Sequence, residues 1–164
     1  MISIGLISDT HGYIDEEVFS FFSDCDEIWH AGDFGNMETA GKLSSFKPLR
    51  GVYGNIDDHK IRLVYPKILC FNCEGVDTLI THDGGYPAHY QLNLLSILKT
   101  NPPKLLITGH SHILRIMYDK QFNFLFMNPG AAGKYGIHKQ ITMIRFIADS
   151  GKIKDVDVYE KPRG

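Results

Sequence analysis

The sequence predicts an α/β (α+β) fold in which two packed β-sheets are flanked by outer helices. In the first half, apolar β-branched runs alternate with amphipathic segments, an order that is typical of parallel strands joined by helices. In the second half, short strand-like runs follow one another between turns, which indicates antiparallel pairing. The 164 residues and the hydrophobic fraction of 43% suit one domain, residues 1–164, with a core of its own.

The first half contains three predicted strands and two predicted helices. The strands are residues 2–8, 27–31 and 48–53, and the helices begin at Asp15 and Met37, the second ending near Phe46. Asp15 is suited to N-cap the first helix, because Val18 and Phe22 then share one face. In parallel sheets, binding sites form outside the carboxyl ends of the strands. The residues that follow each strand are therefore the first candidates for function.

The second half is predicted to be richer in strands. The strands are residues 67–72, 76–81, 104–108, 113–118, 122–127, 140–148 and 152–159, and a helix spans residues 88–99. The first two strands form a hairpin, and Pro102-Pro103 ends the helix. We expect the last four strands to be a run of antiparallel neighbours.

Composition and termini narrow the class of protein. A formal net charge of −2 gives no global attraction to nucleic acid or to an anionic membrane. No apolar segment reaches the length of a transmembrane helix, and the N-terminus lacks the basic region of a signal peptide. Three cysteines, an odd number, fit reduced thiols. We therefore expect a cytoplasmic protein without a membrane or a specific nucleic-acid partner.

Cys70 and Cys73 form a C-x-x-C pair, which can mark a zinc knuckle or a redox site. A knuckle needs a second pair, and only Cys25 remains. Residues 72–75 also indicate a turn between two strands, so local structure is the favoured explanation of the spacing.

Seven side chains with nitrogen or oxygen donors stand where apolar runs give way to polar turns. They are Asp9, His11, Asp33, Asn55, His82, His110 and His112. Such a mixture of carboxylates, imidazoles and an amide suits Mn, Fe, Ni or Zn better than Ca or Mg. Two divalent cations against two carboxylates leave a site about two units positive, which favours an anionic phosphoryl substrate. Taken singly, each Asp or Asn is better explained as a helix N-cap, and a core or turn role is the alternative for His82, His110 and His112.

Together, these motifs resemble the calcineurin-like metallophosphoesterases, and in particular the small YfcE-type phosphodiesterases of bacteria and archaea. The motifs are Asp9-x-His11, Gly32-Asp33, Gly54-Asn55, His82, Gly109-His110-Ser111-His112 and Asn128-Pro129-Gly130. Several motifs in the family order carry far more weight than one alone. The resemblance covers about residues 3–138 and implies a four-layer αββα β-sandwich flanked by helices.

The resemblance also implies the role of each donor. Asp9, His11 and His112 would hold a first divalent metal ion. Asn55, His82 and His110 would hold a second, and Asp33 would bridge the two. Mn²⁺ is the first choice, with Fe, Ni or Zn as alternatives. A metal-bridging hydroxide would attack phosphorus in line with the leaving group, with Asn55, Asp33 and His82 in the catalytic set and Asn55 also bonded to a phosphoryl oxygen.

Two positions depart from the wider superfamily. Many larger members carry a histidine after the Gly-Asn pair, where this chain has Ile56, which cannot protonate a leaving group. His89, His138 or a metal-bound water then has to supply that proton. Asp83 stands where close relatives often have glycine, and it adds an anion beside the predicted ligands. Lys134 and His138 are candidate substrate contacts in a glycine-rich loop.

Three functions follow from these patterns. The first is a two-metal phosphodiesterase, or a phosphatase, that hydrolyses a small soluble phosphate ester. The resemblance to the family also suggests a homodimer or a homotetramer. The second is a scaffold for protein partners, as in a eukaryotic retromer subunit that resembles the family. The third is a nuclease, which the mild negative charge disfavours.

His30 is expected beside the metal loop as a supporting residue, and Asp57 and Asp58 are expected to orient the Asn55 loop.

Overall fold

The computed structural model describes residues 1–164 and contains two five-stranded sheets. The first sheet has the order β10-β9-β1-β2-β3. Its strands are β1 (Ile2–Ile7), β2 (Glu27–His30), β3 (Leu49–Gly51), β9 (Gln140–Asp149) and β10 (Lys152–Pro162). β1, β2 and β3 are parallel, as the first half of the sequence predicts, and β9 pairs antiparallel with β1.

The second sheet has the order β4-β5-β6-β8-β7. Its strands are β4 (Ile68–Cys73), β5 (Val76–Thr81), β6 (Leu105–Ile107), β7 (Leu114–Asp119) and β8 (Phe124–Pro129). The predicted hairpin of β4 and β5 is confirmed. The expected single run of antiparallel strands is wrong, because β8 also pairs in parallel with β6, and β9 and β10 extend the other sheet.

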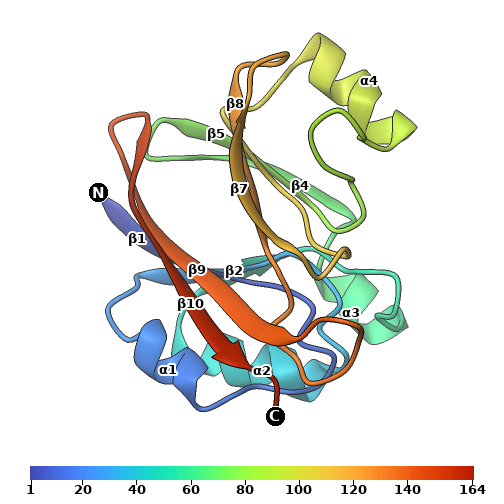
Figure 1. Ribbon diagram of the computed structural model, residues 1–164, viewed down its shortest axis with the longest axis vertical. Helices are drawn as coiled ribbons and strands as arrows, with labels where there is room; N and C mark the ends of the chain where they lie inside the picture. Colours follow the sequence, from blue (N-terminus) through green and yellow to red (C-terminus); the bar gives the residue numbers. More distant parts are fainter.

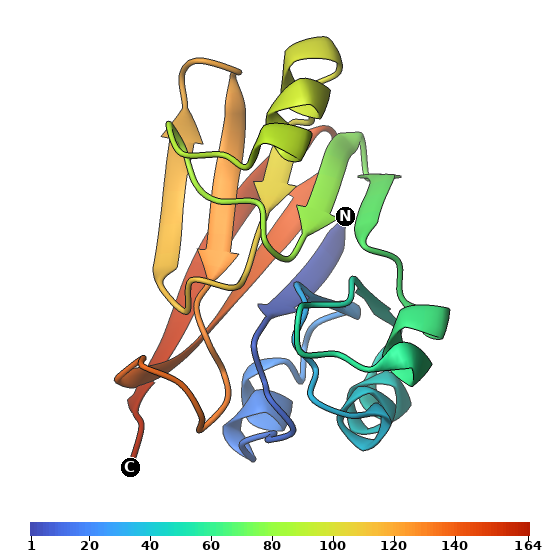
Figure 2. The same ribbon diagram turned by 90° about the vertical axis from the view of Figure 1, so that its right-hand side faces the viewer.

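Three clusters of buried hydrophobic residues lie between the layers of the fold. The cluster between the sheets joins Leu6 and Trp29 of the first sheet to Ile80 and Ile107 of the second. A cluster around Phe22 packs helices α1 (Glu17–Phe21) and α2 (Met37–Phe46) on the outer face of the first sheet. A third cluster packs α4 (Leu92–Thr100) on the outer face of the second sheet. The predicted αββα order is thus confirmed (Figure 1), and Figure 2 shows the red β9–β10 pair passing behind the second sheet.

The helices depart from the sequence prediction in three places. α1 begins at Glu17, although the predicted cap Asp15 does accept a hydrogen bond from the Glu17 backbone N–H at 3.0 Å. The predicted helix at residues 88–99 begins later, at Leu92. A short helix, α3 (His59–Val64), lies where no helix was predicted, and Asp58 caps it by accepting from the N–H groups of Lys60 and Ile61. None of the four helices has the length and apolar character that crossing a bilayer requires.

The cysteines show no shared site. Cys70 is exposed and Cys73 is buried, and both lie in β4, whose side chains alternate between faces. Side chains three residues apart on a strand point to opposite faces, so these two thiols cannot coordinate one zinc ion. The turn predicted around them falls at Glu74-Gly75, where both residues have positive φ.

Candidate metal centre

The seven candidate donors gather at one end of the sandwich because each follows the carboxyl end of a strand. Asp9 follows β1, Asp33 follows β2, and Asn55 follows β3 in the first sheet; His82 follows β5 in the second. The Gly109–His112 segment links β6 to β7. Two groups of donor atoms result, and within each group the atoms lie within 4.8 Å of one another. The groups are Asp9, His11 and His112, and Asp33, His82 and His110.

The backbone at these donors is left-handed, a conformation that residues other than glycine rarely adopt. Five of the seven donors have positive φ: Asp9 (52°), His11 (48°), Asp33 (61°), His110 (69°) and His112 (63°). Such residues each cost about 1–3 kcal/mol and persist where surrounding bonds hold them. Here, Gly32 O accepts from Asp9 N–H at 2.9 Å, and Asp33 O accepts from His11 N–H at 3.1 Å. The strained backbone at these residues therefore points their side chains into the site.

One glycine is required by this crowding. A Cβ atom at Gly54 would overlap both the backbone nitrogen and the carboxylate of Asp33. The glycine of the Gly-Asn pair thus lets the β3 loop approach Asp33 closely enough for Asn55 to reach the same site.

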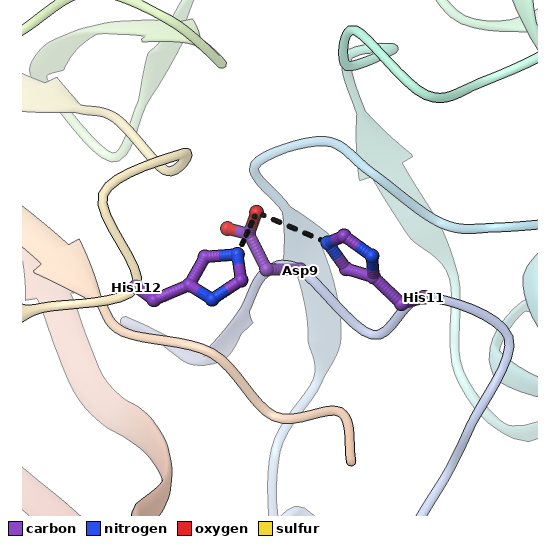
Figure 3. Close-up of side chains that lie close together, drawn as sticks. All are labelled: Asp9, His11 and His112. Atoms are coloured by element: carbon purple, nitrogen blue, oxygen red, sulfur yellow. Dashed lines mark ion pairs between the residues drawn. The ribbon is translucent and has the colours of Figure 1, made fainter. Parts of the chain in front are cut away.

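In the first group, the Asp9 carboxylate lies between two imidazoles (Figure 3). Its Oδ1 atom is 3.3 Å from His112 Nε2 and 3.7 Å from His11 Nε2. The other oxygen, Oδ2, accepts hydrogen bonds from Ser8 Oγ at 2.6 Å and from His110 N–H at 3.1 Å. Asp9 Oδ1 and His11 Nε2 are buried and lack a hydrogen-bond partner. Buried polar atoms without partners are rare, and these two face the place where a cation would sit.

The tautomer of His112 is set by a second histidine. His138 Nε2 donates to the Gly133 carbonyl at 2.7 Å, and burial lowers the pKa of His138, so its ring is neutral with a free lone pair on Nδ1. His112 Nδ1 lies 3.1 Å from His138 Nδ1 and must donate to its lone pair. His112 Nε2 is then left to face Asp9 as an acceptor. In this arrangement neither nitrogen of His138 is free to donate to a substrate.

In the second group, an outer hydrogen bond again determines which ring nitrogen of a histidine faces the site. His82 Nδ1 donates to the Ala31 carbonyl at 2.8 Å, so its Nε2 also faces the site as an acceptor. That Nε2 lies 3.0 Å from Asn55 Oδ1 and 3.2 Å from Asp33 Oδ2, while His110 Nδ1 lies 3.1 Å from the same Asn55 oxygen. Acceptors this close repel one another unless a positive charge lies between them. A proton can supply that charge, and a divalent cation would replace it with several ligand bonds at once.

Asp33 lies between the two groups. Its Oδ2 atom is 3.4 Å from His11 Nε2 in the first group and 3.2 Å from His82 Nε2 in the second. Its Oδ1 atom accepts the Ile56 backbone N–H at 3.1 Å, which fixes the carboxylate plane. A carboxylate in this position can contact two cations. The donor set present therefore fits a pair of metal ions.

The charges of the site agree with this fit. Burial raises the pKa of the Asp9 carboxyl, but the nearby imidazoles of His11 and His112 favour its charged form, outweigh burial and hold that pKa well below its usual range. Burial and the imidazoles of His11 and His82 act on Asp33 in the same opposing way, and its pKa is also lowered. The carboxylates of Asp33 and then Asp9 raise the pKa of His11 to about 9. Both carboxylates are thus ionised near neutral pH and attract positive charge.

Supporting residues surround the donors. As expected from the sequence, His30 is buried beside the metal loop, where its Nδ1 accepts the Gly32 N–H at 3.0 Å and its Nε2 meets Thr10 Oγ1 at 3.0 Å. Burial lowers the pKa of His30 to about 3, so the ring is neutral. The Asp57 carboxylate accepts the N–H groups of Phe34, Gly35 and Gly54 at 2.8–3.2 Å and so ties the Asp33 loop to the Asn55 loop.

Ser8 and Asn128 are supporting residues that the sequence analysis did not assign. Asn128 Nδ2 donates to the Gly109 carbonyl at 2.9 Å and to Ser111 Oγ at 3.1 Å, which holds the histidine-rich segment. The Asn128-Pro129-Gly130 motif was the available signal for Asn128. Nothing in the local sequence distinguishes Ser8 from any serine that ends a strand.

The remaining predicted residues make other contacts. Asp83 Oδ1 is 4.0 Å from His110 Nε2 and half-exposed, so it stands behind that ring. Lys134 Nζ lies over the Tyr13 ring at 4.4 Å from its centroid, and His89 packs on Tyr86. Ile56 is exposed to 45%, and it reaches Asp33 through its backbone rather than its side chain. No hydrogen bond or ion pair joins Lys134 or His89 to the seven donors.

Comparison with known proteins places this chain in a family. The sequence model of the calcineurin-like phosphoesterase superfamily domain matches residues 2–151. A probable metallophosphoesterase of Methanothermobacter thermautotrophicus is 31% identical over 135 residues, which cover 78% of this chain and 76% of the relative.

Solved structures share the fold over nearly the whole chain. An archaeal phosphodiesterase has a TM-score of 0.73 at 20% identity, covering 96% of this chain and 100% of its own. Vps29 of Chaetomium thermophilum has a TM-score of 0.75 at 16% identity, covering 98% and 97%. At these identities the structures establish the architecture alone, whereas the family match extends along most of the sequence. The chain belongs to the calcineurin-like phosphoesterase superfamily.

Proposed function

We propose that this protein is a two-metal phosphoesterase, and specifically a phosphodiesterase, that hydrolyses a small soluble phosphate ester. The observation that supports it most directly is the convergence of lone pairs at the site. His82 and His112 each donate one ring N–H to an outer partner and turn the other nitrogen toward a buried carboxylate. Outer hydrogen bonds of this kind are typical of histidines that bind metal.

The two groups define the proposed ligands. Asp9, His11 and His112 would hold one divalent cation, His82, His110 and Asn55 the other, and Asp33 both. Mn²⁺ is the proposed ion, with Fe, Ni or Zn as alternatives that the same donors accept. Bound cations would neutralise charge on a phosphoryl group and lower the pKa of a coordinated water, which supplies a nucleophile near neutral pH.

The chain's own residues then have separable tasks. Two carboxylates leave about two positive charges on a loaded site, so a phosphodiester anion is attracted more strongly than a neutral ester. Asn55 is exposed and has its oxygen beside His82 and His110, so its amide N–H groups are free to bond a phosphoryl oxygen. Ile56 provides no proton for the leaving group. We therefore expect fastest turnover with esters whose leaving groups are weakly basic.

The test is hydrolysis of bis-p-nitrophenyl phosphate against p-nitrophenyl phosphate by metal-stripped protein, with and without added Mn²⁺, Ni²⁺ or Zn²⁺. We expect metal-dependent cleavage that favours the diester. A preference for the monoester would make the protein a phosphatase. Absence of cleavage with every metal, in protein whose folding is verified by circular dichroism, would overturn the proposal in favour of a scaffold, for which the shared fold with Vps29 is the structural precedent.

A further inference from the structure

A cavity of about 260 Å³ opens beside the second donor group. Asn55 and His82 line it, together with Arg62 of α3 and Asp83 of the loop that leads from β5 to α4. These two elements lie on the same side of the molecule (Figure 1). Apart from Tyr53, every residue that lines it is polar or glycine: Gly54, Asn55, Arg62, Lys67, Thr81, His82, Asp83 and Asn93. Three larger hollows on the surface contact none of the seven candidate ligands.

Two cations line this cavity without a carboxylate partner. Neither Arg62 nor Lys67 forms an ion pair within 4.0 Å, and Lys67 makes no side-chain hydrogen bond within the chain. Asp83 is the one carboxylate in the lining, and it bonds Gln91 at 3.4 Å and faces His110. The lining therefore carries one net positive charge in addition to the charge of the metal site.

Arg62 is held in place before any ligand arrives. Its Nε donates to the Asp57 carbonyl at 2.8 Å, and its guanidinium lies 4.5 Å from the centroid of the Tyr53 ring. Its Nη2 also approaches the Asn55 carbonyl at 3.4 Å, which ties it to the candidate ligand loop. A guanidinium fixed by a backbone carbonyl and an aromatic face loses little side-chain entropy on binding an anion. Its remaining N–H groups are available to such an anion.

We propose that this cavity, the anion pocket, binds a second negatively charged group of the substrate while the scissile phosphate occupies the metal centre. The inference rests on the proposed phosphoesterase function and gives it a substrate class: phosphodiesters whose non-leaving alcohol carries a carboxylate or a phosphate. Lys67 provides a mobile charge and Arg62 a fixed one. Esters with uncharged substituents bind without either contact.

Matched synthetic diesters test the pocket. One series is p-nitrophenyl esters of ω-carboxyalkyl phosphates with linkers of two to five carbons, and the other carries a carboxamide in place of the carboxylate. The leaving group and the chemical step are the same in both, so the ratio of kcat/KM between the members of a pair reports the substituent alone. The ratio is measured with Mn²⁺ for wild type, Lys67→Gln and Lys120→Gln. Lys120 is an exposed lysine in the β7–β8 turn, at the far end of β7 from His112.

For wild type, we expect the carboxylate member to be favoured at one or more linker lengths. Lys67→Gln should lower that ratio by up to about fivefold, the upper end of the effect of one partly exposed charge pair, and Lys120→Gln should leave the ratio at the wild-type value. Arg62→Gln should lower it further, since two or more N–H donors are lost. A wild-type ratio of one at every linker length would overturn the pocket, and so would a ratio in Lys67→Gln that equals the wild-type ratio. In either case, turnover of both esters would still support the phosphoesterase proposal.

Calorimetry separates the two proposals if neither ester is hydrolysed. Titration of 4-phosphonobutyrate and its amide into Mn²⁺-supplemented protein measures binding without turnover. Tighter binding of the carboxylate by wild type, lost in Lys67→Gln, would support the pocket although the catalytic proposal had failed. Equal binding of the two phosphonates would overturn the pocket directly.

Discussion

The orientation and tautomer of two site histidines are determined by their hydrogen bonds to residues outside the donor groups. His82 and His112 each have one nitrogen committed to a donor role, the first toward the Ala31 carbonyl and the second toward His138. Each ring is therefore fixed in both orientation and tautomer before a cation binds. Such pre-organisation reduces the entropy that binding has to overcome and excludes the tautomer that would point a proton at the site.

Asp33→Asn tests the bridging role that we propose for this residue. The change keeps the shape of the side chain and its bond with Ile56 N–H, but removes the charge shared by the two donor groups. We expect metal content to fall and kcat to drop by about 100-fold or more. Metal analysis and steady-state kinetics measure the two effects. Normal metal content with normal turnover would rule out the bridge, and the circular dichroism spectrum should match wild type.

His138→Ala tests positioning through His112. Removing the acceptor frees the His112 ring to rotate and to change tautomer, so the affinity for metal should fall about 10- to 100-fold. Calorimetric titration of Mn²⁺ into metal-free protein measures this loss. His59→Ala is the matched control, because His59 is exposed at the start of α3 and makes no side-chain hydrogen bond or ion pair. An unchanged affinity in His138→Ala would show that His112 does not depend on His138.

At this scale the sequence predicts which residues are donors but not how they are held. His11 and His110 are recognised by their motifs, whereas the contact of His112 with His138 joins residues whose spacing follows no local rule. It depends on the path of the Gly133–His138 loop, which folds back so that Gly133 N–H bonds the Asp9 carbonyl. Such a loop path is set by tertiary packing rather than by local sequence pattern.

Among the elements, the loops after the parallel strands bear the strain of the site. Five of the seven donors in these loops have left-handed backbone, which costs free energy that the surrounding contacts must offset. Asp57 counteracts this cost by accepting three backbone N–H groups from two of these loops. The loops after β2 and β3 are thus one structural unit.

Asp57→Ala should uncouple these loops. Loss of a buried carboxylate that satisfies three N–H groups should lower the free energy of unfolding by about 2–4 kcal/mol and weaken Mn²⁺ binding. Urea unfolding and metal titration check both effects. Asp58→Ala is the comparison: it removes only the cap of α3, should cost about 1 kcal/mol, and should keep the affinity for metal. Equal effects of the two substitutions would contradict the coupling.

The elements also show where prediction from sequence ends. Strand ends were found because β-branched runs such as the one before Asp9 stop abruptly at polar residues. α3 was missed because its six residues bury only Ile61, too few for a helical period to be visible. The division of the later strands between two sheets was missed for another reason: alternation indicates a strand but not its partner.

For the whole molecule, one ion pair ties the last strand to the start of α1. Lys161 Nζ in β10 lies 3.0 Å from Asp15 Oδ2, across most of the chain. Burial raises the pKa of Asp15, but the Glu17 N–H and Lys161 outweigh it and lower that pKa below its usual value. A carboxyl with a lowered pKa stabilises the fold above its ordinary pKa of about 4 and loses that effect as the pH falls.

Asp15→Asn should therefore destabilise the protein at neutral pH by about 1 kcal/mol, a value limited by the exposure of Lys161. The difference from wild type should shrink as the pH falls below about 4, because the carboxyl of the unfolded chain is protonated there first and the folded carboxyl follows at its lower pKa. Thermal unfolding across pH 3–7 follows both proteins. Glu16→Gln serves as control, since Glu16 is exposed and unpaired. A difference that persists at the lowest pH would assign the effect to packing rather than to charge.

The placement of the donors has a further consequence for the intact chain. Each donor group takes side chains from loops of both sheets, with Asp9 and His112 drawn from distant parts of the sequence. A cation held there would act as a non-covalent cross-link between the sheets. At a concentration 100 times the Kd, such binding adds about 2.7 kcal/mol, or roughly 5–10 °C in melting temperature for a chain of this size. Melting curves would thus rank candidate metals without any substrate in hand.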